Sequence, residues 1–424
     1  MNPNRRDFIK SVSIAAIVTL ITKDLSSYAK TSPQILLRSG WQIENIGDIS
    51  HTPGLLHLLE IYIPNAIVTF WPHYHYLPKE EVDMLKCRFP KLKIVEGILI
   101  ADGVASTSDL DLAINQSDFF LHCSGPATIG WAEALAFKKR TGKSYGVYGV
   151  TYGLYGVPEK EMLSDAAFVY FRDSVSLAKA NEDGVKARIT GFAPDAAFAF
   201  DIENKEKANQ FLKENQLETK QFLCCIPKHR ATPVWLHEQK NKPFDAQKNA
   251  RNEAMMEHDH LPMRQAIIEV VRKTQLKVLI VAEDITQVEL GKKEIYDKLP
   301  ADIQKRVVWR SQFWMPDEAL SVYKQSAGMF SNEMHSPILC IGHGIPALVC
   351  RWAEQSSKGA MWRDIGLGDW LFNFDVEEEV KLLVPQVLDM ALNPIAFFEK
   401  AIKAQQRVKE FQKITMSLVK DVLN

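Results

Sequence analysis

Residues 118–150, DFFLHCSGPATIGWAEALAFKKRTGKSYGVYGV, contain a strand, a helix and a second strand. Asp118–Cys123 and Ser144–Val150 are short apolar runs of the kind found in strands that are buried on both faces. Between them, Ile129–Arg140 carries apolar residues at helical spacing. Strands joined through a helix lie parallel in a sheet, so this unit predicts an α/β fold with helices on both faces.

The same alternation of strands and helices continues on both sides of this unit. Further strands are predicted at Ala66–Phe70, Ala167–Phe171, Phe222–Ile226, Val278–Val281, Val307–Trp309, Gly328–Asn332 and Ala347–Val349. The charged helix Lys205–Asn215 separates a first round from a second. We therefore predict two α/β lobes with parallel sheets, residues 38–205 and 206–393, followed by a C-terminal helix at residues 394–424. The polar stretch Trp235–His260 has no periodicity and is predicted to be a long surface excursion.

The first thirty residues are typical of a twin-arginine signal peptide. The motif Arg5–Lys10 (RRDFIK) is followed by the apolar run Val12–Ile21, which is short for a membrane span. Small residues at Ser27 and Ala29 predict cleavage after Ala29, so that residues 1–29 are removed; an uncleaved N-terminal anchor is the alternative. We expect the twin-arginine translocase as a partner during export and a periplasmic or secreted mature protein.

The composition argues against several classes of function. A formal net charge of −1 provides no basic surface for nucleic acid. No later apolar stretch is long enough for a stable membrane span. The six cysteines lack the paired spacing of a zinc site, and most lie in apolar runs, so we expect buried free thiols. We expect no cofactor and no resident metal.

Polar residues that follow the predicted strands mark the candidate site, because ligands bind beyond the carboxyl ends of strands in open parallel sheets. Arg172 follows a buried strand and offers a planar guanidinium that suits a carboxylate, although an ion pair with Asp173 or Asp195 is the structural alternative. His335 begins a predicted helix, where an imidazole can face an anion and transfer a proton. The other candidate binding residues are Asn45, Asp48, His73, His75, Ser124, Lys228, Arg230, Ser336 and Lys358.

These binding candidates differ in the chemistry that they offer. Lys228, Arg230 and Lys358 are cations that suit an anionic group or, equally, a solvated surface. Asn45–Asp48 (NIGD) places a glycine where a backbone comes close to a ligand, or simply caps the next helix. In Trp71–Tyr76 (WPHYHY) the aromatic rings suit stacking on a sugar, and the two histidines suit a metal ion.

The order of these motifs resembles that of the polysaccharide pyruvyl transferase family, whose members move a pyruvyl group from phosphoenolpyruvate onto a sugar diol as a cyclic ketal. The matching segments are Asn45–Asp48, Phe171–Ser174, Pro194–Phe198, Met334–Ser336, Gly344–Leu348 and Lys358–Gly359. The resemblance implies two Rossmann-like lobes in a GT-B-like arrangement, with the substrate between the lobes and the last helix crossing back to the first lobe. It also implies a pyruvylated polysaccharide or oligosaccharide as partner.

The sequence departs from the family at Glu333, where the family usually has an arginine that helps to hold the donor's phosphate. An acid there repels phosphate, and the glycine-rich turn of the first lobe is reduced to Ser124–Pro126 (SGP). Phosphoenolpyruvate is made and used in the cytoplasm, whereas this protein is predicted to be exported. We therefore predict a hydrolase that removes pyruvate ketals, with Arg172 holding the pyruvyl carboxylate and Glu333 and His335 exchanging protons.

Three alternatives stay open at the level of the sequence. A phosphoenolpyruvate-dependent pyruvyl transferase is expected if export fails or if Lys228, Arg230 or Lys358 replaces the missing cation. A non-catalytic glycan-binding protein would bind a glycan in the cleft but would not catalyse transfer or hydrolysis of the ketal. A metal-dependent hydrolase would use His73 and His75 as ligands.

Overall fold

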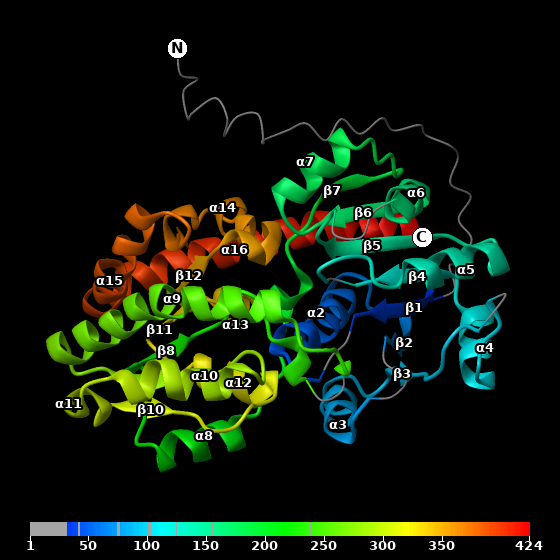
Figure 1. Cartoon of the computed structure of the whole chain (residues 1–424). Helices are drawn as coiled ribbons and strands as arrows, with labels where there is room; N and C mark the ends of the chain where they lie inside the picture. The colour runs from blue at the N-terminus through cyan, green and yellow to red at the C-terminus, as the bar shows by residue number, and fades with distance from the viewer. Residues whose placement is uncertain are drawn as a thin grey trace. The chain divides into compact units, whose positions relative to one another are not determined.

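Two parallel β-sheets form the framework of the protein (Figure 1). The computed structural model describes residues 32–40, 43–73, 77–100, 103–123, 125–153, 157–237 and 240–424, so the predicted signal peptide lies outside the described residues. Residues Ser32–Asn424 form one compact unit. The α/β fold with two parallel sheets that the sequence predicts is confirmed, whereas the lobe limits at residues 38–205 and 206–393 stay predictions.

The first sheet has seven strands in the order β3-β2-β1-β4-β5-β6-β7, and the second has six in the order β10-β9-β8-β11-β12-β13. Their bounds are β1 (Gln34–Ser39), β2 (Ile67–Pro72), β3 (Lys93–Ile94), β4 (Phe119–His122), β5 (Tyr145–Val150), β6 (Phe168–Phe171), β7 (Thr190–Phe192), β8 (Phe222–Ile226), β9 (Lys277–Ile280), β10 (Val307–Trp309), β11 (Gly328–Ser331), β12 (Ala347–Arg351) and β13 (Leu371–Asn373). Every strand predicted from an apolar run is present. The sequence-based prediction missed β1, β3, β7 and β13. Strands β3, β7 and β13 are only two or three residues long, and the apolar residues of β1 are flanked by Gln34 and by Arg38.

Helices connect the strands and cover both faces of the sheets. They are α2 (Ile46–Tyr62), α3 (Lys79–Arg88), α4 (Ser108–Gln116), α5 (Trp131–Thr141), α6 (Val157–Asp165), α7 (Ser174–Glu182), α8 (Lys205–Glu214), α9 (Ala246–Lys273), α10 (Gln287–Leu290), α11 (Ala301–Gln304), α12 (Pro316–Tyr323), α13 (His335–Gly342), α14 (Ala360–Asp364), α15 (Glu377–Leu392) and α16 (Pro394–Leu423). We use "first lobe" for the elements up to β7 and "second lobe" for those from α8 to α15.

The alternation of side chains along β1 shows how both faces of the first sheet are buried. Ile35 and Leu37 belong to a large core that continues into the second lobe, while Leu36 belongs to a separate core on the opposite face. Every residue of β4, β5 and β8 is buried. This double burial explains why these strands appear in the sequence as continuous apolar runs.

The surface excursion predicted at Trp235–His260 is wrong over its second half. Helix α9 begins at Ala246, after Asp245 caps it by accepting a hydrogen bond from the backbone nitrogen of Lys248. Its first turns are mostly exposed, and continuous burial begins only near Asp259. A helix whose first half faces solvent has no apolar stripe, so periodicity alone could not reveal it.

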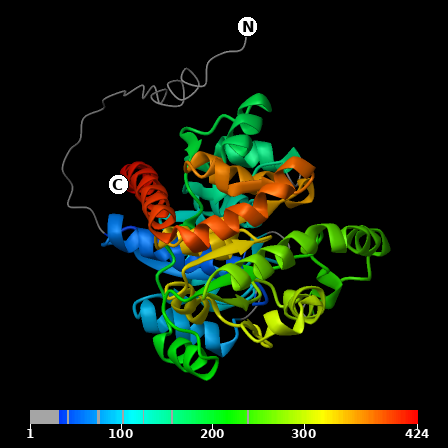
Figure 2. The ribbon, with the colours of Figure 1, turned by 90° about the vertical axis from the view of Figure 1, so that its left-hand side faces the viewer.

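The C-terminal helix α16 returns to the first lobe, as expected. The Tyr148 hydroxyl lies 3.0 Å from Oγ1 of Thr415, and the rings of Phe192 and Phe411 meet edge to face at 5.1 Å. Figure 2 shows this helix in red, running toward the C-terminus. The last helix therefore ties the two lobes together.

The sequence predicts no stable membrane span in the mature protein and buried free thiols. Among the described residues, no single helix is long and apolar enough to cross a membrane; the pair α15 and α16 meets that test only jointly, across a bend of 102°. All six cysteines are free thiols, and all except Cys87 are buried.

Candidate active site

The lobes touch where the loops after their central strands meet. The backbone nitrogen of Ile46 donates to the carbonyl of Glu283 at 2.8 Å, and the nitrogen of Ile285 donates to the carbonyl of Glu44 at 3.0 Å. We call the charged group around this junction the interlobe site. Its members are Glu44, Asp48, His51, Arg172, Asp195, Lys228, Lys240, Glu283, Asp284, Glu333, His335 and Lys358.

His335 forms a pair with Glu283, a residue that the sequence-based prediction missed. Its Nδ1 lies 3.1 Å from Oε1 of Glu283, and the backbone nitrogen of Ser336 donates to Oε2 at 2.5 Å. Through these contacts Glu283 caps α13 and orients the imidazole of His335. The Glu283 side chain is fully buried. The only available signal in the sequence was the acidic pair Glu283–Asp284 directly after a predicted strand.

A second histidine–carboxylate pair lies in the first lobe. His51 Nδ1 lies 2.8 Å from Oδ1 of Asp195, and both side chains are fully buried. The other oxygen of Asp195 accepts a hydrogen bond from Nη1 of Arg172 at 2.9 Å. Burial opposes ionisation, but His51 and Arg172 outweigh it and hold the pKa of Asp195 well below its usual range. Asp195 therefore stays a carboxylate.

Arg172 thus makes the ion pair that was its structural alternative. Its Nε donates to the hydroxyl of Thr151 at 2.8 Å, and the side chain is 2% exposed. These bonds fix the guanidinium at the end of β6. Its predicted contact with a substrate carboxylate stays a prediction.

The two imidazoles face each other across the junction. The rings of His51 and His335 meet edge to face, with centroids 5.1 Å apart. Nδ1 of each ring faces a carboxylate, and neither Nε2 has a hydrogen-bond partner among the described residues. In the neutral form of His335, Nδ1 donates and Nε2 is an acceptor. Burial lowers the pKa of His335 well below its ordinary value, and the charge of Lys358 adds to this effect. His335 is therefore a neutral base near pH 7.

Gly47 makes this close approach of the lobes possible. A Cβ at this position would lie 2.1 Å from Nδ1 of His335, closer than any real contact. Gly47 therefore leaves room for the imidazole of His335, which comes from the other lobe. Asn45 caps α2, since its Oδ1 accepts from the nitrogen of Gly47 at 2.8 Å, and its amide donates to Asp284 at 3.3 Å.

Asp48 follows on the first turn of α2, one turn before His51. Its carboxyl is buried, and this burial raises its pKa to about 6, although His51 and Lys240 oppose the shift. Asp48 therefore holds its proton below about pH 6. Such a carboxyl can act as a general acid.

Glu333 and His335 have separate partners. Oε1 of Glu333 accepts hydrogen bonds from Lys228 and, at 2.7 Å, from the amide of Gln287. Its Oε2 lies 3.8 Å from the ammonium of Lys358. Glu333 is 1% exposed and acts here as the counter-charge of the lysines. Among the described residues, no hydrogen bond joins Glu333 to His335.

Three residues of this site have the composition of a metal site. Ligand atoms of His51, Asp195 and His335 all lie within 4.8 Å of one another. The imidazole Nδ1 atoms already meet Asp195 and Glu283, and Arg172 pairs with Asp195. A bound cation would have to break the hydrogen bond between His51 and Asp195 and lie close to a guanidinium, so these residues fit a metal poorly.

A family model described as polysaccharide pyruvyl transferase matches residues 45–354, which contain both histidine–carboxylate pairs. The chain belongs to the polysaccharide pyruvyl transferase family. Comparison with curated proteins finds no match to this family member.

Solved structures share the fold of this pyruvyl transferase family member. A putative UDP-N-acetylglucosamine 2-epimerase from Listeria monocytogenes has a TM-score of 0.56 and 14% identity, covering 91% of this chain and 94% of that one. Anabaena Alr3699/HepE in complex with UDP and glucose has a TM-score of 0.53 and 12% identity, covering 92% and 99%. MnaA from S. aureus with UDP has a TM-score of 0.54 and 14% identity, covering 92% and 97%. These neighbours confirm the GT-B-like fold.

Arg230, predicted to hold an anion, is instead enclosed by acids. Its Nε and Nη2 donate to Asp259 at 2.8 and 3.0 Å, and its Nη1 donates to Asp375 at 2.5 Å. Its guanidinium also lies over the ring of Trp352, and the side chain is 1% exposed. These partners match the charge of Arg230 in the family member and indicate a structural role, and its predicted role in binding an anion stays a prediction.

The remaining predicted site residues of the family member are Ser336, His73, His75, Ser124 and Lys358. The hydroxyl of Ser336 accepts from Tyr323 at 3.2 Å, so this serine supports α13. His73 is exposed after β2, while His75 and Ser124 lie outside the described residues. Lys358 is 15% exposed, and burial lowers its pKa although Glu333 opposes the shift.

Proposed function

We propose that the interlobe site removes pyruvate ketals from a polysaccharide by hydrolysis. The observation that carries this proposal is the combination of a neutral His335, oriented by Glu283, with the protonatable carboxyl of Asp48 in one buried site. Hydrolysis of a ketal needs a proton donor for the departing oxygen and a base for water, and these residues supply both.

The charge balance of the site supports hydrolysis over use of a phosphorylated donor. The interlobe site contains six carboxyl groups, from Glu44, Asp48, Asp195, Glu283, Asp284 and Glu333. Besides its two histidines, it contains one arginine and three lysines, Arg172, Lys228, Lys240 and Lys358. Phosphoenolpyruvate would add a phosphate and a carboxylate to this acidic group, whereas a pyruvate ketal adds only one carboxylate. In a buried site the extra like charges are costly.

In the first step, the Asp48 carboxyl protonates one sugar oxygen as its bond to the ketal carbon breaks. Water then attacks the resulting oxocarbenium ion, and Nε2 of His335 takes a proton from that water. The hemiketal hydroxyl returns a proton to Asp48, while protonated His335 supplies the second sugar oxygen. One water is consumed, free pyruvate and the sugar diol are released, and both residues recover their starting states.

Lys358 is the cation that we assign to the pyruvyl carboxylate, with Arg172 beside it. The Lys358 ammonium lies 3.8 Å from Glu333, beyond a normal hydrogen bond, and its side chain is partly exposed. Lys228 is less suitable, because its charge is paired with Glu333. Burial alone would lower the pKa of Lys228, but Glu333 raises it.

Phosphoenolpyruvate-dependent transfer is the second candidate. One observation favours it, namely that Lys228 and Lys358 neutralise Glu333, so the acid does not confront a phosphate alone. Strong thermal stabilisation by phosphoenolpyruvate, greater than that by pyruvate, would support transfer.

We also propose that the mature protein acts in the periplasm or outside the cell, because its N-terminal sequence resembles a twin-arginine signal. Replacement of Arg5 and Arg6 by lysine should retain the precursor in the cytoplasm. Fractionation followed by N-terminal sequencing tests this, and an unchanged distribution of the variant would contradict it.

The experiment for the activity is incubation of the protein with a pyruvylated galactan, without phosphoenolpyruvate, and measurement of free pyruvate. Release should fall by about 100-fold or more in His335→Ala and Asp48→Asn, the range expected for loss of positioned proton transfer. Glu289→Gln, an exposed change on α10, is the matched control. Binding of the galactan without release would instead indicate a non-catalytic glycan-binding protein.

A further inference from the structure

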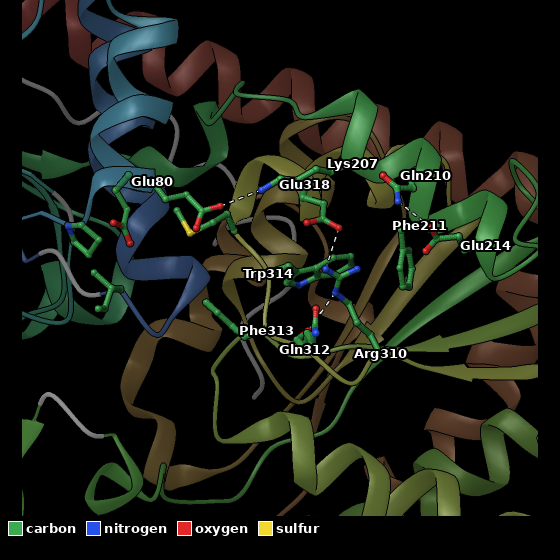
Figure 3. A pocket seen from close by; sticks show the side chains of 14 residues that line it. Glu80, Lys207, Gln210, Phe211, Glu214, Arg310, Gln312, Phe313, Trp314 and Glu318 are labelled. Atoms are coloured by element: carbon green, nitrogen blue, oxygen red, sulfur yellow. Dashed lines mark hydrogen bonds and ion pairs between the residues drawn. The ribbon is translucent and has the colours of Figure 1, made fainter.

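A separate hollow of 530 Å³ is lined by both lobes and shares no residue with the interlobe site (Figure 3). Its size falls within the range of small-molecule sites. The first lobe contributes α3, and the second contributes α8, α12 and the segment after β10. The residues that matter for its chemistry are Glu80, Glu81, Lys207, Glu214, Arg310 and Glu318.

One wall of the hollow is held rigid by Arg310. Its guanidinium lies 4.5 Å from the ring centres of both Phe211 and Trp314. It also forms an ion pair of 2.9 Å with Glu318. The indole nitrogen of Trp314 donates to a backbone carbonyl at 3.1 Å. This wall is therefore preformed, and the charge of Arg310 is already matched.

The remaining charges leave the hollow acidic. Lys207 pairs with Glu80 at 3.0 Å, so each of the two cations has a carboxylate partner. Glu214 accepts only a neutral amide hydrogen bond from Gln210, at 2.8 Å. Within the described part of the chain, no cation forms an ion pair with Glu81 or Glu214. A ligand that brings a positive charge would balance this excess.

Glu81 is the residue that points most directly to such a ligand. Its side chain lines the hollow but is only 3% exposed, and its Oε2 has no hydrogen-bond partner among the described residues. Burial raises the pKa of Glu81 to about 7, and the neighbouring Glu80 adds to the shift. A buried, unpaired carboxyl is costly, and a cationic donor is the group that relieves that cost.

We propose that this hollow binds an amino sugar with a free ammonium group, which Glu81 receives. The amides of Gln210 and Gln312 and the carboxylate of Glu214 suit the sugar's hydroxyls, and Phe313 offers an apolar surface. Figure 3 labels Gln210, Glu214, Gln312 and Phe313 among the side chains that line the hollow. The site is independent of the ketal chemistry and stands if that chemistry is disproved.

The test compares two probes by isothermal titration calorimetry at pH 7, a β-1,4-linked glucosamine disaccharide and its N-acetylated counterpart. The unaltered protein should bind the free amine at least about tenfold more tightly, since only that probe carries a cation. Glu81→Gln should reduce this preference to within about threefold. Glu206→Gln, a change at an exposed residue of α8 that does not line the hollow, should leave it intact.

Equal binding of both probes, or no binding of either, would overturn the proposal. So would a preference that survives Glu81→Gln in a folded variant. A linear diamine that binds as tightly as the amine disaccharide would overturn the assignment to a sugar. If Glu81→Gln does not fold, the comparison of probes with the unaltered protein still decides.

Discussion

Gly47→Ala tests whether the close approach of the two lobes is needed to position His335. The added methyl group would lie 2.1 Å from Nδ1 and 2.2 Å from Cγ of His335, where a carbon contact needs roughly 3.5 Å. The lobes or the imidazole must therefore move by about 1 Å or more. Overpacking of this kind costs about 1–3 kcal/mol, and the gain in helix propensity returns up to about 1 kcal/mol.

The expected net loss of unfolding free energy for Gly47→Ala is thus at most about 3 kcal/mol, while activity should fall far more. A displacement of about 1 Å at the chemistry can cost about 100-fold in rate. Denaturant unfolding and pyruvate release measure the two effects separately. Gly368→Ala is the control, because its nearest atom would lie at 3.4 Å. A Gly47→Ala protein with full activity would refute the reasoning.

Four further predictions concern charged groups. Glu283→Gln should lower pyruvate release by about 100-fold with little change in KM, because Glu283 orients His335; an equal loss of glycan binding would contradict this. Activity should fall as pH rises through about 6, where Asp48 loses its proton, and Asp48→Asn should lack this pH dependence. The folded-state pKa of Asp48 is raised, so the free energy of unfolding of the unaltered protein decreases as pH rises from about 4 to about 6. Asp48→Asn should therefore be up to about 3 kcal/mol more stable than the unaltered protein at pH 8, as denaturant unfolding measures. Arg230→Met should destabilise the protein by about 3–5 kcal/mol through uncompensated Asp259, and a smaller change would contradict its structural role.

The sequence was most informative where burial is greatest. Strands β4, β5 and β8 are enclosed on both faces, so nearly all of their residues are apolar and the order of strands and helices can be recognised in the sequence. Helix α9 was missed because its exposed half lacks an apolar stripe. The edge strands β3 and β13 are too short for a recognisable pattern.

The candidate site was only partly predictable, because its decisive contacts join distant segments. His335 and Arg172 follow predicted strands and could be selected from their position, whereas Asp48 could be selected from the Asn45–Asp48 motif before a helix. Glu283 and His51 acquire a role only through contacts across 52 and 144 residues of sequence. Glu333 was assigned a proton-transfer role because the lysines that surround it cannot be inferred from neighbours in the chain.

The most direct test of the proposed hydrolysis follows ketal and pyruvate together by proton NMR. The protein is mixed with a pyruvylated galactan, and the methyl signals of the bound ketal and of free pyruvate are recorded with and without phosphoenolpyruvate. Hydrolysis predicts that the ketal signal falls and the pyruvate signal rises in equal amounts, at the same rate in both samples. A ketal signal that is stable alone and grows only when phosphoenolpyruvate is added would contradict the account.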